Sequence, residues 1–184
     1  MKLTLKIMNS KSEQILNSLG MFDKSEDIQI LIQIINEMEA LYNLQEPDSK
    51  EWPEVRKAEA DLWFRVLQSV RKKINRDYDF DNPPQINIAP PGPYPSGTAP
   101  ESIKEPEIRK EYEKAIAKNE AITKRYNFQY KLRDIEKKLS RKMEDLLVRA
   151  YSKAPQSSAE LIKYFEKYNV EQETRTRILK RINE

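Results

Sequence analysis

The sequence predicts an all-α fold, and three features of its composition and pattern support that class. Of the 184 residues, 38% are hydrophobic and 34% are charged, a balance typical of helices with a narrow apolar stripe and a wide solvated face. The chain holds only three glycines, too few for the positive-φ positions that hairpins and tight crossovers need. Along most of the chain, apolar residues recur at intervals of three and four. This length suffices for one domain or two small ones.

Residues 1–76 are predicted to form an N-terminal helical bundle. The first seven residues alternate between apolar and polar side chains, and the stretch up to Met8 indicates either a short strand or a frayed end. Ser10 and Glu13 then have the spacing of a capping box. Because glycine commonly ends helices, we expect a short helix that stops at Gly20.

Two longer helices are expected in the rest of this bundle. Asp23 and Glu26 repeat the capping spacing ahead of an apolar stripe that runs from Ile28 to Tyr42. A second stripe runs from Val55 to Ile74. Pro53 is tolerable there, since the first turn of a helix has no use for its missing N–H group.

Residues 77–106 differ in composition from the rest of the chain and are predicted to form a proline-rich arm or linker. Eight of the eleven prolines and two of the three glycines fall in this segment. The run Pro90–Pro95 can form neither helix nor central strand. Either the arm packs along a helical surface through Tyr94 and Ile88, or it is a flexible linker. We favour the packed arm, and we favour it over an exported PxxP ligand formed by Pro90 and Pro93.

Residues 107–184 are predicted to hold one long helix and a C-terminal helical hairpin. Helix-compatible sequence extends from Pro106 to about Ser152, which is roughly 70 Å at 1.5 Å per residue. The apolar stripe changes its phase near Asn127, which indicates a kink, a break, or a continuous helix that packs against different partners along its length. After Pro155, two short apolar stripes predict the hairpin, and this segment either stands alone or packs with residues 1–76 as one elongated domain.

The residue types exclude most catalytic chemistry. The chain has no histidine and no cysteine, so it lacks the commonest general base, the thiolate nucleophile and the commonest transition-metal ligands. Its scattered glycines cannot form a phosphate-binding loop. We therefore predict no enzyme activity, no catalytic residue and no cofactor.

Neither the hydrophobic pattern nor the cysteine content assigns a location. No stretch approaches the roughly 20 apolar residues of a membrane helix, and the first residues are too charged for a signal peptide. A leader removed before residue 1 stays open, as do the compartment and the oligomeric state. The expectation is a soluble chain.

One acidic segment has part of a calcium-loop pattern. Asp77, Asp79 and Asp81 occupy positions one, three and five of an EF-hand loop. Position six is Asn82 instead of glycine, and position twelve is Ile88 instead of glutamate. We therefore predict no metal site and interpret the segment as a solvated exit from the preceding helix.

The charge is unevenly distributed and indicates a candidate interface. Residues 1–106 carry a net charge of −4 and residues 107–184 one of +7. Basic side chains recur beside the apolar stripe of the long helix, where three aromatic residues also mark the phase change. The candidate partner interface comprises Lys124, Lys131, Lys138, Lys142, Arg149, Tyr126, Phe128 and Tyr130.

Three interpretations of the basic side chains compete. They pair within the molecule with acidic residues of the first bundle, they bind an acidic partner protein, or they contact nucleic-acid phosphates. The acidic residues in question are Glu37, Glu39, Glu54, Glu59 and Asp61. The function we expect is that of a non-enzymatic protein–protein interaction or scaffold component with a protein partner. The alternative is a nucleic-acid-binding accessory protein that uses the basic C-terminal half.

Overall fold

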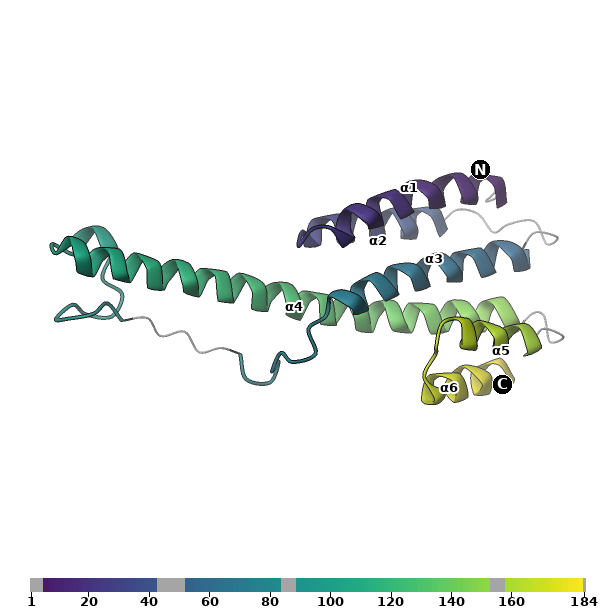
Figure 1. The fold of residues 1–184 in the computed structure, drawn as a ribbon. Helices are drawn as coiled ribbons and strands as arrows, with labels where there is room; N and C mark the ends of the chain where they lie inside the picture. Colours follow the sequence, from purple (N-terminus) through teal and green to yellow (C-terminus); the bar gives the residue numbers. More distant parts are fainter. Residues whose placement is uncertain (1–4, 43–51, 84–88, 153–157, 184) are drawn as a thin grey trace. The chain divides into compact units, whose positions relative to one another are not determined.

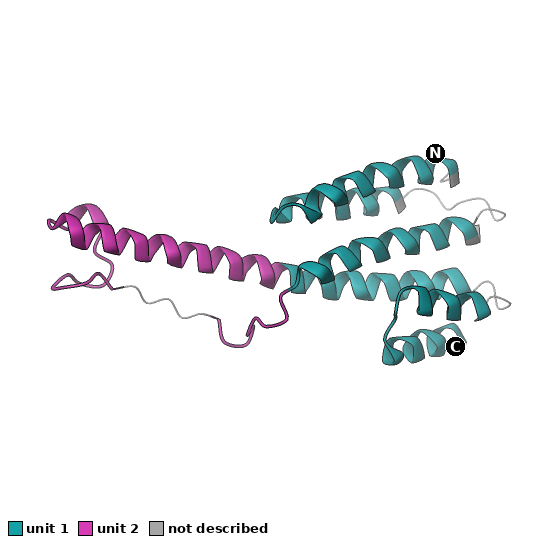
Figure 2. Ribbon diagram, in the orientation of Figure 1, with its two compact units in different colours: residues 1–74, 132–184 teal, residues 75–131 magenta. Residues whose placement is uncertain are grey.

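The computed structural model describes residues 5–42, 52–83, 89–152 and 158–183, which contain six α-helices and one 3₁₀ turn but no strand (Figure 1). The predicted all-α class is therefore confirmed. The chain divides into two compact units: unit 1 comprises residues 1–74 and 132–184, and unit 2 comprises residues 75–131 (Figure 2). Unit 2 joins the proline-rich arm to the first half of the long helix. The domain boundaries at 76 and 106 stay a prediction.

Helices α1 (Leu5–Asp23) and α2 (Ile28–Tyr42) form a hairpin in unit 1. Of the two alternatives for the first eight residues, the short strand is wrong for residues 5–8, because they begin α1. The expected stop at Gly20 is also wrong: the helix continues to Asp23, and burying Phe22 on its inner face outweighs the roughly 1 kcal/mol that an interior glycine costs. The N-cap of α2 is Asp27, not Asp23, since its carboxylate accepts the N–H of Gln29 at 2.8 Å.

Helix α3 (Trp52–Lys73) is the central helix of unit 1, with Pro53 in its first turn as predicted. It meets α1 through the Lys73 ammonium group, 5.0 Å from the ring centre of Phe22. Because it has neighbours on several sides, it buries side chains around most of its circumference. The buried residues of α3 are Val55, Arg56, Glu59, Ala60, Leu62, Trp63, Phe64, Val66, Leu67, Ser69 and Val70.

Helix α4 (Pro106–Ser152) is unbroken over 47 residues, with the bounds that the sequence predicts. Up to Lys131 it buries only Tyr112 and Gln129. From Leu132 onward its inner face is a continuous part of the unit 1 core, formed by Leu132, Leu139, Met143, Glu144, Leu146, Leu147, Ala150 and Tyr151. Of the three explanations for the phase change near Asn127, a helix with different partners along its length is the one observed.

Helices α5 (Ser158–Lys167) and α6 (Gln172–Asn183) form the predicted C-terminal hairpin. Asn169 turns the chain with a φ of 47°, and the Val170 N–H donates to the carbonyl of Phe165 at 2.9 Å. The rings of Tyr164 and Tyr168 pack against Phe64 of α3, so this hairpin closes one side of the unit 1 core. Pro155 lies outside the described residues.

The described part of the arm, 77–83 and 89–105, does not continue as polyproline II. Gly92 has a φ of 94°, far from the roughly −75° of that conformation, so the PxxP segment is interrupted. Ile103 is fully buried and its carbonyl accepts hydrogen bonds from the Arg109 guanidinium group of α4. The last part of the arm therefore packs on the start of α4, as favoured above. The Tyr94 hydroxyl group donates to Glu105, which is itself a residue of the arm, and Ile88 lies outside the described residues.

Candidate functional site

The eight residues predicted for a partner interface do not form one described site. Unit 2 contains five of them and unit 1 the other three. Those in unit 2 are Lys124, Tyr126, Phe128, Tyr130 and Lys131, and those in unit 1 are Lys138, Lys142 and Arg149. The two groups therefore have to be described separately.

In unit 2 the tyrosines of α4 belong to a cluster of four aromatic rings. The ring centres of Tyr78, Phe80 and Tyr126 form a near-equilateral triangle, with separations of 6.0, 6.2 and 6.3 Å. The ring of Tyr130 stacks on Tyr126 at 6.4 Å with an interplanar angle of 25°. These separations lie in the range of favourable aromatic pairs. We call these four residues the aromatic cluster.

Local geometry explains why two segments distant in sequence meet at this cluster. Tyr126 and Tyr130 are four residues apart on α4 and so share one face of the helix. The Tyr126 hydroxyl group donates to the carbonyl oxygen of Phe80 at 3.3 Å. The side-chain amide oxygen of the buried Gln129 accepts the N–H of Asn75 at 2.7 Å. These two hydrogen bonds fix the beginning of the arm against the helix.

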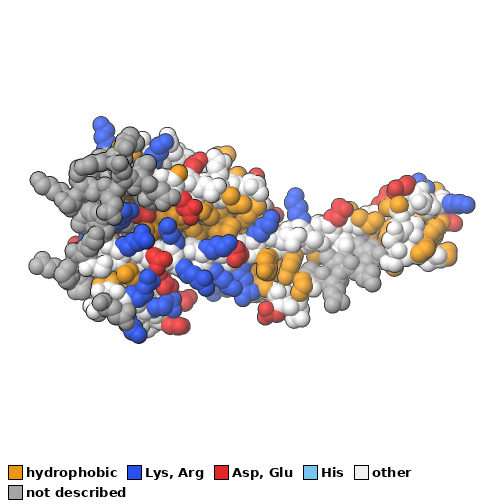
Figure 3. All heavy atoms as spheres, turned by 180° about the vertical axis from the view of Figure 1, so that it is seen from behind, with side chains coloured by type: hydrophobic (Ala, Val, Ile, Leu, Met, Phe, Trp, Pro, Cys, Tyr) orange, Lys and Arg blue, Asp and Glu red, His pale blue; other side chains and the backbone are white. Residues whose placement is uncertain are grey.

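The aromatic cluster is only partly buried. Tyr130 keeps 57% of its surface exposed, and the other three residues are half-buried. Hydrophobic side chains gather at the surface over this part of α4 and the arm (Figure 3). Phe128, which the sequence grouped with the tyrosines, makes no ring contact with them among the described residues, because it points to a different side of the helix.

Sequence reasoning missed Tyr78 and Phe80 as members of the cluster. Their segment, Asp77–Asp81, alternates carboxylates with aromatic rings. Only the carboxylates entered the sequence-based interpretation, as part of a calcium-loop pattern, and the two rings between them did not. In an extended chain alternate side chains share a face, so the two rings were a recognisable pair. What the sequence did not indicate was the helix face on which that pair packs.

The three aspartates of this segment are not arranged around a metal ion. The Asp79 carboxylate is engaged within its own segment. It accepts a hydrogen bond from the side-chain N–H of Asn82 at 2.8 Å and two more from backbone N–H groups. The hydrogen bonds from Asn82 hold the pKa of Asp79 below its usual value. In the described ranges, no three acidic side chains converge as they would on a cation.

In unit 1 the predicted basic residues are largely engaged within the molecule. Lys138 pairs with Asp134 at 2.8 Å on the solvent side of α4. The Lys142 ammonium group lies 5.7 Å from the ring centre of Trp63. The positive charges of Lys142 and Arg149 also oppose the rise in the pKa of Glu59 of α3, but within the described residues neither forms an ion pair with its carboxylate.

Glu59 is the most deeply buried carboxyl group of the described residues, with 1% of its surface exposed. It accepts a hydrogen bond from the Arg56 guanidinium group at 2.7 Å. Burial raises the pKa of Glu59, and the positive charges of Arg56, Lys142 and Arg149 oppose that rise. Of the other predicted acidic partners, Asp61 pairs with Lys167 at 3.4 Å, whereas Glu37 accepts a hydrogen bond from Gln33 of its own helix.

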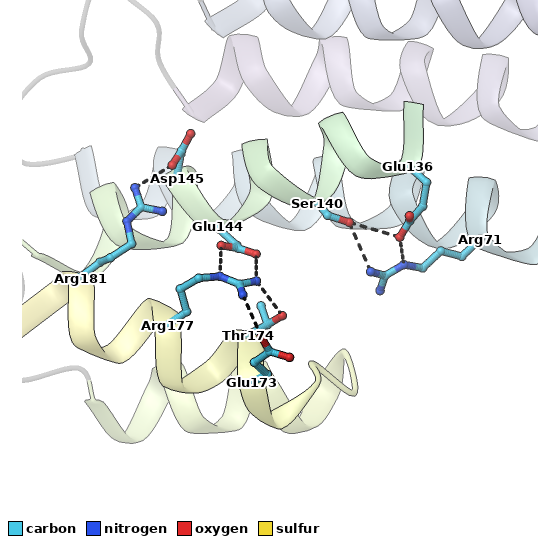
Figure 4. A network of polar contacts seen from close by, with 9 residues as sticks. All are labelled: Arg71, Glu136, Ser140, Glu144, Asp145, Glu173, Thr174, Arg177 and Arg181. Carbon is cyan, nitrogen blue, oxygen red and sulfur yellow. Dashed lines mark hydrogen bonds and ion pairs between the residues drawn. The ribbon is translucent and has the colours of Figure 1, made fainter. Parts of the chain in front are cut away.

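A second set of ion pairs joins α4 to its neighbours in unit 1 (Figure 4). Glu144 accepts two hydrogen bonds from Arg177 of α6, at 2.6 and 2.9 Å, and Asp145 pairs with Arg181 at 2.7 Å. On the α3 side, Arg71 pairs with Glu136 at 2.9 Å. Glu144 and Asp145 belong to the same C-terminal half as Arg177 and Arg181, so these two pairs leave its net charge of +7 unchanged. The sequence reasoning did not name them.

The described helices include none with the length and apolar character required to cross a bilayer. No protein-family model matches the chain, and comparisons with curated proteins and with solved structures find no similar chain.

Proposed function

We propose that this chain is a non-enzymatic protein-binding component, and that its contact surface is the aromatic cluster. The observation that carries the proposal is the exposed ring of Tyr130, stacked on the hydrogen-bonded ring of Tyr126. Tyrosine is enriched among residues that dominate binding energy, because it offers a large rigid surface with a polar tip.

The cluster is also pre-organised for binding. Tyr126 is held by three ring contacts and by its hydrogen bond to Phe80, so docking a partner there costs little side-chain entropy. Other large hydrophobic residues with substantial exposure, such as Met21 and Ile162, are not part of any described ring cluster. An exposed but fixed group of rings is a better binding surface than isolated flexible side chains.

The absence of histidine and cysteine supports a non-enzymatic role. Glu59, the buried carboxyl group with a raised pKa, is the residue that most resembles a catalytic acid. It lies inside the helical bundle with 1% of its surface exposed and is hydrogen-bonded to Arg56, so a substrate has no access to it. We therefore assign it a structural role.

Nucleic-acid binding is the alternative function and has weaker support. Of the predicted basic residues, Lys124 and Lys131 are exposed in unit 2. Lys138 pairs with Asp134, and the Lys142 ammonium group lies near the ring of Trp63, which reduces the positive charge that these two residues can offer to phosphates.

Site-specific cross-linking tests the proposal. A photoreactive phenylalanine analogue in place of Tyr130 should capture a protein partner in the cells that make this chain. The same analogue in place of Glu113, an exposed residue on another side of α4, is the matched control and should capture none. The captured partner is then produced and its affinity for the purified full chain is measured.

With the purified partner, Tyr130→Ala should weaken binding at least tenfold, as expected for a central aromatic contact. Tyr130→Phe keeps the ring and should bind within about threefold of the original chain. Ile162→Ala removes an exposed apolar residue of unit 1 and should have no effect. Equal capture at positions 130 and 113, or unchanged affinity of Tyr130→Ala, would contradict the proposal, as would salt-sensitive binding of RNA or DNA that depends on Tyr130.

A further inference from the structure

The arm side of the aromatic cluster is acidic. Residues 77–81 read Asp-Tyr-Asp-Phe-Asp, so each ring that the arm contributes is flanked by carboxylates. Arg76 is the single basic residue of the stretch 75–82, which has three acidic ones. All three aspartates are exposed, while Tyr78 and Phe80 are half-buried against α4. The segment whose rings pack on Tyr126 therefore carries exposed carboxylates on either side of those rings along the chain.

We propose that the aromatic cluster binds a cationic segment of its partner, with an arginine or lysine side chain placed over the exposed ring of Tyr130. This inference rests on the proposed function and names the chemistry of the partner. A guanidinium or ammonium group is attracted to the face of an aromatic ring, and arginine also stacks on it. Adjacent carboxylates add charge attraction and steer a basic segment toward the site.

The carboxylates of Asp77 and Asp81 are the ones available to such a partner. That of Asp79 is already occupied by the side chain and N–H of Asn82. Within the described parts of the chain, the carboxylates of Asp77 and Asp81 make no hydrogen bond or ion pair. The arm segment that packs on Tyr126 thus carries negative charge, which is complementary to a basic peptide.

On the helix side, the exposed charges nearest Tyr130 are of both signs: Arg133 and Asp134 lie three and four residues further along α4. Within unit 2, Ile122 and Thr123, both about two turns before Tyr130, are uncharged. At about 100° per residue, Lys131 and Lys124 point roughly 100° and 120° away from Tyr130. The lysines predicted for the interface thus lie beside this face and not on it.

The same charges disfavour two other classes of ligand. Nucleic-acid phosphates are repelled by Asp77 and Asp81, although bases stack well on tyrosine. A neutral proline-rich peptide also docks on aromatic rings, but it gains nothing from the carboxylates. Both classes serve as competing outcomes in the test.

The test uses the purified full chain and fluorescein-labelled peptides of ten residues. The peptides share a glycine–serine frame and carry four arginines, four glutamates or four prolines, and a poly-dT oligonucleotide is added as the fourth probe. Fluorescence anisotropy at low and high salt gives the dissociation constants. We expect the arginine peptide to bind, with an affinity that falls as salt rises, and the other probes to bind at least tenfold more weakly.

Variants locate the binding. Tyr130→Ala, and the double variant Asp77→Asn with Asp81→Asn, should each weaken binding of the arginine peptide at least fivefold. Tyr130→Phe should stay within about twofold. Glu113→Gln together with Glu111→Gln removes the same charge from exposed residues of α4 and is the matched control, expected within about twofold. All substituted residues are exposed, so the fold should be retained, and circular dichroism checks it.

Arginine-peptide binding that all these variants leave unchanged would overturn the inference, as would equal or tighter binding of the glutamate, proline or poly-dT probe. These results are distinguishable from failure of the proposed function. If position 130 captures a partner whose contacting segment is acidic or apolar, the protein-binding role stands and the cationic partner is wrong. If the arginine peptide binds through Tyr130 but position 130 captures no protein, the chemistry of the surface stands and the proposed function is wrong.

Discussion

Helix α4 shows two ways of maintaining helical structure in one continuous element. Its second half, from Leu132, contributes a full apolar face to the core of unit 1. Its first half, up to Lys131, buries two side chains and exposes most of the others, including Ala115, Ala117 and Ala121. The two halves have the same secondary structure but differ in what stabilises it.

The difference follows from where each kind of helix gets its stability. Most helical stability in proteins comes from packing an amphipathic face, and that applies to the second half. The first half is rich in alanine, glutamate and lysine, which have high intrinsic helix propensity. Its tertiary support comes from the arm, through contacts such as those of Ile103 with Arg109 and of Phe80 with Tyr126. The exposed aromatic cluster therefore lies on the more weakly supported half.

The largest expected effect comes from truncating one apolar side chain in each half. Leu147 is fully buried, and Leu147→Ala should lower the free energy of unfolding of unit 1 by about 2–5 kcal/mol. Ile122 is 39% exposed, and Ile122→Ala should cost less than about 1 kcal/mol. Urea unfolding followed by the fluorescence of the buried Trp63 and by circular dichroism measures both. Similar losses for the two variants would show that the first half has a core of its own.

Removing an ion pair should have the next largest effect. Arg177→Ala leaves the buried carboxylate of Glu144 without its two guanidinium hydrogen bonds, so it should lower the urea midpoint more than the loss of an exposed ion pair does. Lys138→Ala removes an exposed pair with Asp134 on the same half of α4 and should cost at most about 0.5 kcal/mol. The urea midpoints of the two variants give the comparison. Equal effects would mean that α6 adds no more to α4 than a surface ion pair does.

Much of this fold could be predicted because the apolar stripes are long and strongly periodic. The stripes of α2, α3 and the second half of α4 gave the correct helices, and Pro106 marked the start of α4. The errors fell at α1 and at one cap. Gly20 has the sequence signature of a helix end, but tertiary burial of Phe22 decided the outcome. At α2, two acidic residues had cap-like spacing, and local geometry selected Asp27.

The candidate site was less predictable. Periodicity placed Tyr126 and Tyr130 on one face of a helix, which is a local property. It could not bring Tyr78 and Phe80 to that face, because their contacts with α4 bridge 46 or more positions of the sequence. For the basic residues, spacing showed a common side of the helix but not that Glu59 and Trp63 of α3 lie next to Lys142. Such long-range contacts depend on the packing of whole helices.

The smallest effect should come from the backbone, and it tests whether the two halves of α4 unfold together. Changing an exposed alanine to glycine within a helix costs about 1 kcal/mol through propensity alone. At position 117, in the first half, Ala117→Gly should speed amide hydrogen exchange near that residue about fivefold. It should leave the urea transition reported by Trp63 unchanged, because opening this half does not require unit 1 to unfold.

The matched comparison uses Lys137, an exposed residue of the second half, changed to alanine and to glycine. The free energy of unfolding, obtained from the urea transition that Trp63 fluorescence reports, should be about 1 kcal/mol lower for the glycine variant than for the alanine variant. The reason is that this half of α4 is part of the core that unfolds in that transition. If Ala117→Gly shifts the Trp63 transition as much as the change at position 137 does, α4 is one cooperative unit. The aromatic cluster would then share the stability of the bundle instead of depending on its contacts with the arm.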